Sequence, residues 1–114
     1  MELKQWYVFK YCAPTRGMLN TGRFPFHFGF YNNQDANDYG VPLNYTMLPA
    51  VLKKEANYRT HAIGKWHMGF RSPGLTPIGR GYDTFLGYCE SPSPLLCLCA
   101  LCPLRRRVNR TTRT

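Results

Sequence analysis

Residues 6–22 have the pattern of a β-strand that passes directly into an α-helix. The run WYVF (Trp6–Phe9) is aromatic and β-branched, which favours a buried strand. The residues that follow are compatible with a helix, with Pro14 in a first turn and Gly22 as the C-terminal stop. A strand that leads into a helix is the building unit of an α/β domain. The junction of the two falls at Cys12.

A second helix is predicted to begin near Thr46, a residue type that caps helices. Its apolar face is formed by residues at positions i, i+3 and i+4, namely Leu48, Val51 and Leu52. Asn57 then occupies the position where a left-handed residue commonly ends a helix.

Residues 58–63, YRTHAI, are predicted to form another strand, and residues 64–69, GKWHMG, a glycine-flanked loop that leaves it. Residues 24–45 show no sustained period and are expected to form a long loop. Residues 79–88, GRGYDTFLGY, read as a turn and a short aromatic segment. Because a helix lies between the two predicted strands, the chain can cross over and bring these strands together in parallel.

Cys12 lies at a position that suits a reactive group. At the start of a helix, the backbone N–H groups and the helix dipole stabilise an anion such as a thiolate. Arg16 follows one helical turn later, so that its guanidinium group can reach the same end and hold an oxyanion through two hydrogen bonds. The alternative interpretation is a half-buried structural cysteine followed by a surface arginine.

Lys65 and His67 form a second cluster, because two residues at i and i+2 after a strand can face the same way around Trp66. Lysine offers a point charge to an anion, and histidine exchanges a proton near neutral pH. A solvated lysine and a hydrogen-bonded structural histidine are the alternative. Both clusters follow predicted strands, and α/β proteins assemble ligand sites at the carboxyl ends of parallel strands.

Two segments resemble the signature motifs of the sulfatase family. CAPTRGMLNTGR, from Cys12, is similar to Cys-x-Pro-x-Arg followed by Leu and Thr-Gly-Arg. NYRTHAIGKWHMG is similar to the second signature, Gly-Tyr-x-Thr-x-x-x-Gly-Lys-Trp-His, with Asn57 in place of the usual glycine. LPAVLKKEANY and TPIGRGYDTFLGY match sulfatases in order and spacing. The resemblance covers about residues 5–88 and is nearest to the arylsulfatase B type, the N-acetylgalactosamine-4-sulfatases.

The resemblance implies an α/β fold, namely part of the alkaline-phosphatase-like sheet-and-helix domain of sulfatases, over residues 1–89. Residues 90–114 combine Ser-Pro, Leu-Cys and Arg-Thr patches of low complexity, and we predict an irregular, disordered tail there. Parallel strands need cover on both faces, which one or two β-α units cannot supply. The chain is therefore expected to be a fragment of the catalytic domain.

The resemblance also implies sulfuric ester hydrolysis, with a sulfated sugar or an aryl sulfate as substrate. Cys12 would become formylglycine through a formylglycine-generating enzyme, whose recognition motif includes Pro14 and Arg16. The hydrated aldehyde would attack the sulfur of the ester and form a covalent sulfo-enzyme. Arg16 would hold the hydrate, Lys65 would pair with the sulfate, and His67 would hydrogen-bond the formylglycine and assist proton transfer.

The family implies a Ca²⁺ ion that binds the sulfate and activates the nucleophile. Of its ligands, only Cys12, as formylglycine, has a counterpart in this sequence. No Asp-Asp pair precedes Cys12, where Glu2 is the sole acidic residue, and the Asp-Asn pair of the family would lie beyond the matching segment. The calcium site is therefore expected to be incomplete, and the chain weakly active or inactive.

The formal net charge of +9 is concentrated at the C-terminus. Residues 1–104 hold ten basic and six acidic residues, a net charge of only +4. The other five basic residues are Arg105, Arg106, Arg107, Arg110 and Arg113. A non-catalytic, small basic binding module that uses this tail is the alternative function, although no nucleic-acid partner is expected.

A Cys₄ zinc site is a further alternative in this region, formed by Cys89, Cys97, Cys99 and Cys102. Their spacing is not that of two Cys-x-x-Cys knuckles, which argues against zinc. The longest apolar run, residues 95–104, is shorter than the ~20 residues of a membrane-spanning helix, so no membrane span is expected.

The resemblance implies a lysosomal or secreted protein. The first ten residues, MELKQWYVFK, lack the apolar core and cleavage site of a signal peptide, so none is predicted in this chain. Two Asn-x-Thr sequons begin at Asn44 and Asn109 and would be glycosylation sites in the secretory pathway.

Overall fold

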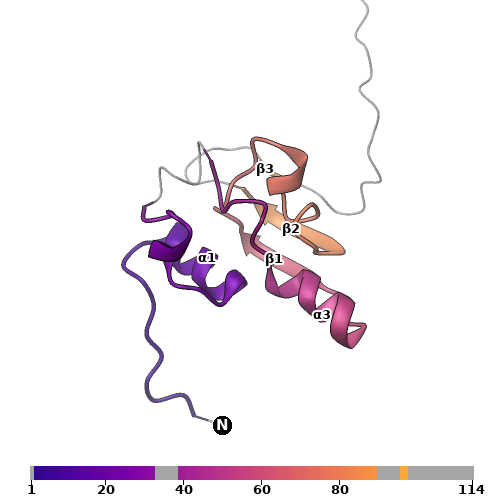
Figure 1. Ribbon diagram of the computed structural model, residues 1–114. Coiled ribbons are helices and arrows are strands. Elements are labelled where there is room, and N and C mark those ends of the chain that lie inside the picture. Colours follow the sequence, from indigo (N-terminus) through magenta and orange to yellow (C-terminus); the bar gives the residue numbers. More distant parts are fainter. Residues whose placement is uncertain (1, 33–38, 90–95, 98–114) are drawn as a thin grey trace, which may run out of the picture.

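The structure is a computed structural model that describes residues 2–32, 39–89 and 96–97 (Figure 1). The elements in chain order are α1 (Cys12–Thr21), the 3₁₀ helix η1 (Pro25–His27), α3 (Leu48–Ala56), β1 (His61–Lys65), the 3₁₀ helix η2 (Pro73–Leu75), β2 (Thr84–Tyr88) and β3 (Leu96–Cys97).

The sheet has the order β1-β2-β3. β1 and β2 pair in parallel, from His61 opposite Thr84 to Lys65 opposite Tyr88. The short β3 runs antiparallel to β2. A parallel strand pair combined with helices confirms the α/β class predicted from the sequence.

Gly87 allows the backbones of β1 and β2 to approach closely. Gly64 lies opposite Gly87 in the register. A Cβ atom on Gly87 would overlap the carbonyl oxygen and the nitrogen of Gly64. Any side chain at position 87 would therefore push the two strands apart.

The strand predicted at residues 6–9 does not form. This segment is extended without strand pairing, and Trp6 and Tyr7 are 65% and 82% exposed. Figure 1 shows the N-terminal segment running away from the body of the protein. β-Propensity is realised only when the backbone finds a partner. β1 instead pairs with β2, which follows it in the chain, so the predicted crossover between residues 6–9 and 58–63 is also wrong.

The start of β2 is tied to the chain just before β1. The amide of Asp83 donates to the carbonyl of Thr60 at 2.8 Å, and the Asp83 carboxylate accepts the amide of Thr60 at 2.8 Å. These reciprocal bonds fix the parallel register. The strand predicted at residues 58–63 consequently begins at His61 and extends to Lys65.

α1 follows its local sequence signals closely. It begins at Cys12, contains Pro14 in its first turn and ends at Gly22, whose φ of 66° is left-handed. Proline is accepted in a first turn because its nitrogen would have no intrahelical partner there, and glycine accepts a left-handed conformation without strain. All three predictions are confirmed.

α3 departs from prediction at its start but not at its end. Its N-cap is Met47 rather than Thr46, and it has no side-chain cap. Asn57 is left-handed, with φ 53°, and ends the helix as predicted. The predicted apolar face is incompletely buried, since Leu48 and Val51 are both exposed.

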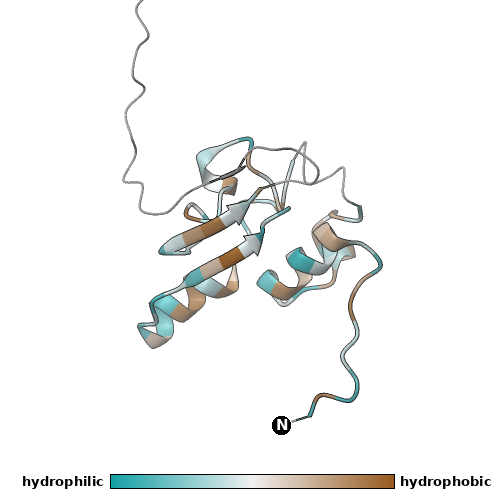
Figure 2. Ribbon diagram, turned by 180° about the vertical axis from the view of Figure 1, so that it is seen from behind, coloured by the Kyte–Doolittle hydropathy of each residue, from teal (hydrophilic) through white to brown (hydrophobic). Residues whose placement is uncertain are grey.

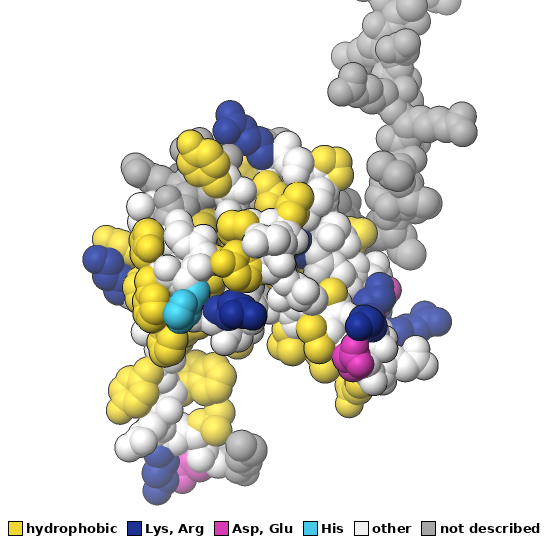
Figure 3. Space-filling view, in the orientation of Figure 1, with side chains coloured by type: hydrophobic (Ala, Val, Ile, Leu, Met, Phe, Trp, Pro, Cys, Tyr) yellow, Lys and Arg dark blue, Asp and Glu magenta, His cyan; other side chains and the backbone are white. Residues whose placement is uncertain are grey.

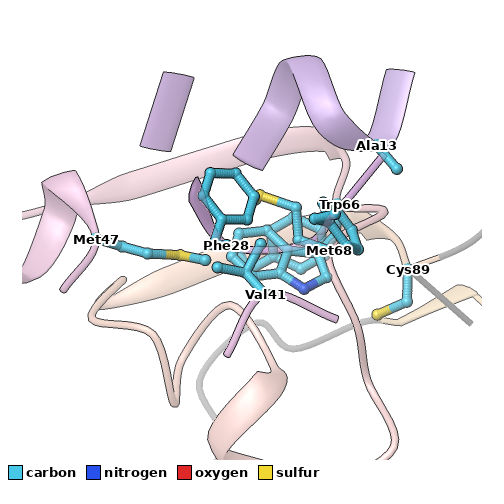
Figure 4. Packing of buried hydrophobic residues seen from close by; sticks show 9 residues of the cluster. Ala13, Phe28, Val41, Met47, Trp66, Met68 and Cys89 are labelled. Atoms are coloured by element: carbon cyan, nitrogen blue, oxygen red, sulfur yellow. The ribbon is translucent and has the colours of Figure 1, made fainter. Parts of the chain in front are cut away.

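The hydrophobic core lies between the sheet, the loop after β1 and the chain between η1 and α3. Figure 4 shows Phe28, Val41, Trp66 and Met68 gathered around its centre. Its buried members are Ala13, Phe28, Phe30, Val41, Met47, Trp66, Met68, Phe85 and Cys89. Three of them come from the stretch predicted as a long loop, which therefore contributes core residues without regular periodicity.

Among the described residues, one face of the sheet packs on this core and the other does not. Phe85 points into the core, whereas Ile63 and Leu86, which face each other across β1 and β2, are 84% and 48% exposed. Figure 2 shows hydrophobic positions in the middle of both strands, seen from the side of the sheet away from α3.

Part of the predicted tail can be compared with the structure, because Leu96 and Cys97 form β3. Cys99, Cys102, the arginine-rich run and Asn109 lie outside the described residues. No helix in the described ranges is long and apolar enough to span a membrane.

Candidate active site

Three side chains that are distant in sequence meet at the N-terminus of α1. The Cys12 sulfur lies 3.1 Å from Nδ1 of His67 and 3.4 Å from Nζ of Lys65. Cys12 is the first residue of α1, Lys65 is the last residue of β1, and His67 lies in the loop that follows. The two clusters singled out in the sequence therefore form one site.

The helix start contributes to the electrostatics around Cys12. The N-cap residue, Tyr11, makes no side-chain cap, and no acidic residue lies in the first turn of α1. The first N–H groups of a helix have no intrahelical partners and carry a partial positive charge. Together with the ammonium group of Lys65, they favour an anion at the Cys12 position.

Arg16 reaches the site in a different way from the one predicted. Its Nη1 group donates a hydrogen bond to the main-chain carbonyl of Lys65. Its Nε group is buried and has no hydrogen-bond partner among the described residues. Arg16 thus joins α1 to the end of β1 and places a positive charge next to His67. In the described part of the chain, no hydrogen bond joins it to Cys12.

His67 is held uncharged at neutral pH. Burial lowers its pKa, and the charges of Lys65 and Arg16 lower the pKa further, to about 4. The side chain is only 3% exposed. In the tautomer that leaves Nδ1 without a proton, this neutral imidazole can accept a proton from a group at the Cys12 position.

Sequence reasoning missed Asp83, which supports the site from the far end of the strands. Its carboxylate accepts hydrogen bonds from Lys53 at 2.7 Å and from the amide of Thr60 at 2.8 Å. The hydrogen bond from Lys53 is the main reason that the pKa of Asp83 falls to about 2. The available sequence signal was the position of Asp83, an acidic residue between the turn at residues 79–82 and the strand-forming residues 84–88.

The open space beside the site lies along α1. Cys12 and Arg16 line a groove of about 420 Å³, together with residues 8–11, Thr15 and Leu19. On the face shown in Figure 3, Lys and Arg side chains are spread apart rather than gathered in one patch. The described part of this face of the molecule therefore does not form a continuous basic binding surface (Figure 3).

The residues around Cys12 do not fit a calcium ion. Calcium takes about six to eight oxygen ligands, mostly from carboxylates and carbonyls. Here a thiol faces an ammonium group and an imidazole. Within residues 2–32, 39–89 and 96–97, no group of three His, Cys, Asp or Glu side chains could hold a metal ion. We therefore derive no catalytic step through calcium.

Comparison with known proteins shows the family of the chain. The family model described as Sulfatase matches residues 1–94. The chain belongs to the sulfatase family. It is 37% identical over 89 residues to arylsulfatase J of Mus musculus, covering 76% of this chain and 15% of that protein. It is 40% identical over 85 residues to N-acetylgalactosamine-6-sulfatase of Homo sapiens, covering 67% of this chain and 16% of that protein.

The fold of this sulfatase chain is also found in solved structures. The crystal structure of Ps i-CgsB matches with a TM-score of 0.63 and 38% identity. The match covers 69% of this chain and 18% of that one. The sulfatase chain therefore spans about a sixth of the length of the proteins it resembles.

Proposed function

We propose that this chain carries the nucleophile end of a sulfuric ester hydrolase, with Cys12 converted to formylglycine. The convergence of Cys12, Lys65 and His67 is the observation that carries the proposal. The Cys12 sulfur marks where an oxygen of the hydrated aldehyde would lie. An ammonium group within 3.4 Å of that position suits a negatively charged sulfate ester, and a neutral imidazole within 3.1 Å suits proton transfer.

The proposed reaction has two covalent steps. One hydroxyl of the hydrate attacks the ester sulfur, the S–O bond to the alcohol breaks, and the alcohol leaves with a proton. The remaining hydroxyl then loses its proton to a base, the C=O bond reforms, and the bond between carbon and the sulfate oxygen breaks. Inorganic sulfate leaves, and water hydrates the aldehyde again.

Each role follows from a contact. Lys65 holds the sulfate oxygens, and His67 accepts a proton from the hydrate through Nδ1. Arg16 fixes Lys65 through its main chain and adds positive charge. Pro14 and Arg16, with Cys12, form the motif for the formylglycine-generating enzyme, and both lie in the first turns of α1.

The substrate class is a sulfated sugar or an aryl sulfate, as in the names of the relatives. The nearer assignment to 4-sulfatases of N-acetylgalactosamine stays a prediction, since the matched relatives include a 6-sulfatase. Asn44 is exposed, which is compatible with glycosylation. A lysosomal or secreted location is part of the same proposal.

The first experiment is mass spectrometry of the peptide that contains Cys12, after expression with and without a formylglycine-generating enzyme. Conversion replaces CH₂–SH with CHO and lowers the mass of that peptide only when the enzyme is present. Cys12 that stays a thiol in both preparations contradicts the proposal.

The second experiment measures hydrolysis of 4-nitrocatechol sulfate by the converted chain. Cys12→Ala removes the nucleophile and should abolish any turnover. Lys65→Met should lower it strongly, whereas Lys4→Met, at an exposed lysine in the N-terminal segment, should leave it unchanged. Turnover that persists in Cys12→Ala would show that another group does the chemistry.

A further inference from the structure

The contact between His67 and Cys12 depends on an unusual backbone turn. The parallel ladder continues past the end of β1, because the amide of Trp66 donates to the carbonyl of Tyr88 at 2.9 Å. The amide of His67 donates to the carbonyl of Cys89, also at 2.9 Å. If the backbone continued in the extended conformation of this ladder, His67 would be part of the strand.

His67 instead adopts a left-handed conformation, with φ 53°. Within the described residues it is one of only two non-glycine residues with positive φ, and the other, Asn57, ends a helix. A positive φ is uncommon for any residue other than glycine, although histidine adopts it more often than most, so contacts around His67 are needed to hold it there.

The side chain of Trp66 provides that constraint. Its indole Nε1 group donates to two main-chain carbonyls of the following loop, Gly69 at 2.8 Å and Leu75 at 3.0 Å. The indole is 2% exposed and packs edge-on against Tyr82 and Phe85. Figure 4 shows Trp66 inside the core cluster.

The rest of the loop is equally constrained. Gly69 has φ 101°, and a Cβ atom there would lie 2.8 Å from the Cα of Gly40. The amide of Val41 donates to the carbonyl of Met68 at 3.3 Å. The loop that follows His67 is therefore tied at Met68 and Gly69, and the indole of Trp66 joins it at Gly69 and Leu75.

We propose that Trp66 is a positioning residue for the reaction at Cys12. Its indole N–H clasps the loop 67–75 and so holds His67 in the left-handed turn that aims Nδ1 at residue 12. The relevance to catalysis rests on the proposed function of His67. The positioning itself is a property of the chain with an unmodified Cys12 thiol, and it can be tested without turnover.

The test replaces only the N–H group. Trp66→benzothienylalanine keeps the shape of the bicyclic ring and puts sulfur in place of N–H. The same replacement at Trp6, which is 65% exposed, is the matched control. Two measurements follow: nuclear Overhauser effects between the His67 imidazole and the Cys12 β-protons, and the alkylation rate of the Cys12 peptide by iodoacetamide at pH 7.

We expect the Trp66 variant to keep its circular dichroism and dispersed amide spectrum but to lose the Overhauser contacts. Alkylation of Cys12 should quicken about fivefold to tenfold, the equivalent of one hydrogen bond, because the imidazole that accepts the S–H bond favours the thiol over the reactive thiolate. His67→Ala in the unaltered chain should quicken alkylation by the same factor, and the two changes together should add nothing further. The Trp6 control should match the unaltered chain in every measurement.

Retained contacts and an unchanged rate in a folded Trp66 variant would overturn the proposal. So would independent, additive effects of the two changes. Loss of the whole fold would also overturn it, because the N–H would then hold the domain rather than the loop. If turnover of 4-nitrocatechol sulfate is absent while the contacts behave as expected, the proposed function fails and the positioning role stands.

Discussion

The buried, uncharged state of His67 makes the stability of this chain depend on pH between about 4 and 6.5. The folded-state pKa of about 4 lies below the ordinary value of 6.5. Over this interval the unfolded chain binds a proton at His67 and the folded chain does not. Stability is therefore highest above pH 6.5 and falls as the pH is lowered towards 4.

The size of the effect follows from these two pKa values. At pH 5 the unfolded histidine is almost fully protonated and the folded one is mostly neutral, which costs at most about 2 kcal/mol relative to pH 8. For a domain of this size, such a change lowers the melting temperature by roughly 10 °C. Asp83 contributes little at pH 5, because its carboxyl group is ionised in the folded chain, where its pKa is about 2, and almost fully ionised in the unfolded chain, where its pKa is near 3.8.

His67→Gln should remove this pH dependence, because glutamine keeps hydrogen-bonding capacity but does not titrate. The assay is urea unfolding followed by tryptophan fluorescence at pH 8 and pH 5. The free energy of unfolding of the unaltered chain should fall by about 2 kcal/mol more than that of the variant. His27→Gln, at an exposed histidine, should behave like the unaltered chain.

The reasoning is refuted if His67→Gln loses as much stability at pH 5 as the unaltered chain does. It is also refuted if the imidazole of His67, followed by NMR in the folded chain, titrates near 6.5. Either outcome would mean that burial and the charges of Lys65 and Arg16 do not act on this group as the geometry requires.

Three further predictions concern other parts of the same architecture. Gly87→Ala should lower the free energy of unfolding in urea by about 3 kcal/mol, since its Cβ atom would overlap the backbone of β1. Gly29→Ala, at a position with positive φ but no atom within 4 Å of a new Cβ, should lower it by only about 1 kcal/mol. Equal losses in the two variants would contradict the overlap. Asp83→Asn should lower the stability at pH 7 and flatten the dependence of stability on pH below pH 4. A carboxylate with a depressed pKa stabilises the fold above its unfolded-state pKa, near 3.8, and stops doing so as the pH falls through its folded-state pKa of about 2. If the hydrogen bonds to Lys53 and Thr60 do not matter, melting temperatures from pH 2 to pH 7 would change with pH as they do in the unaltered chain. In the converted chain, Lys65→Met should lower kcat for 4-nitrocatechol sulfate about a hundredfold, and a change confined to KM would assign Lys65 to ground-state binding alone.

The parts of the fold that could be predicted are those set by neighbouring residues. α1 begins and ends where Pro14 and Gly22 indicate, and α3 ends at Asn57. These signals act within one helical turn, through ring geometry and left-handed propensity. The start of α3 was misplaced by one position, since the side chain of Thr46 makes no cap.

The residues of the candidate site could also be identified, because their types carry the chemistry. A cysteine at a helix start and a Lys-x-His pair after a strand indicate an anion site wherever the fold brings them together. These residues do converge, at 3.1 and 3.4 Å. The prediction that they would do so, however, relied on pairing residues 6–9 with residues 58–63, which was wrong. The site formed all the same, because α1 packs against the end of β1 through Arg16 and Lys65.

The sequence by itself determined both ends of α1, the C-terminal end of α3 and the α/β class, and it singled out the residues of the candidate site. The tertiary structure decided which segment pairs with β1, that residues of the irregular stretch 24–45 fill the core, and that His67 adopts a left-handed turn. Strand pairing and core packing join residues that are tens of positions apart, so no local pattern encodes them. His67 has a positive φ, and its side chain reaches Cys12 next to a loop that the buried indole of Trp66 joins to Gly69 and Leu75, contacts that only the folded chain can make.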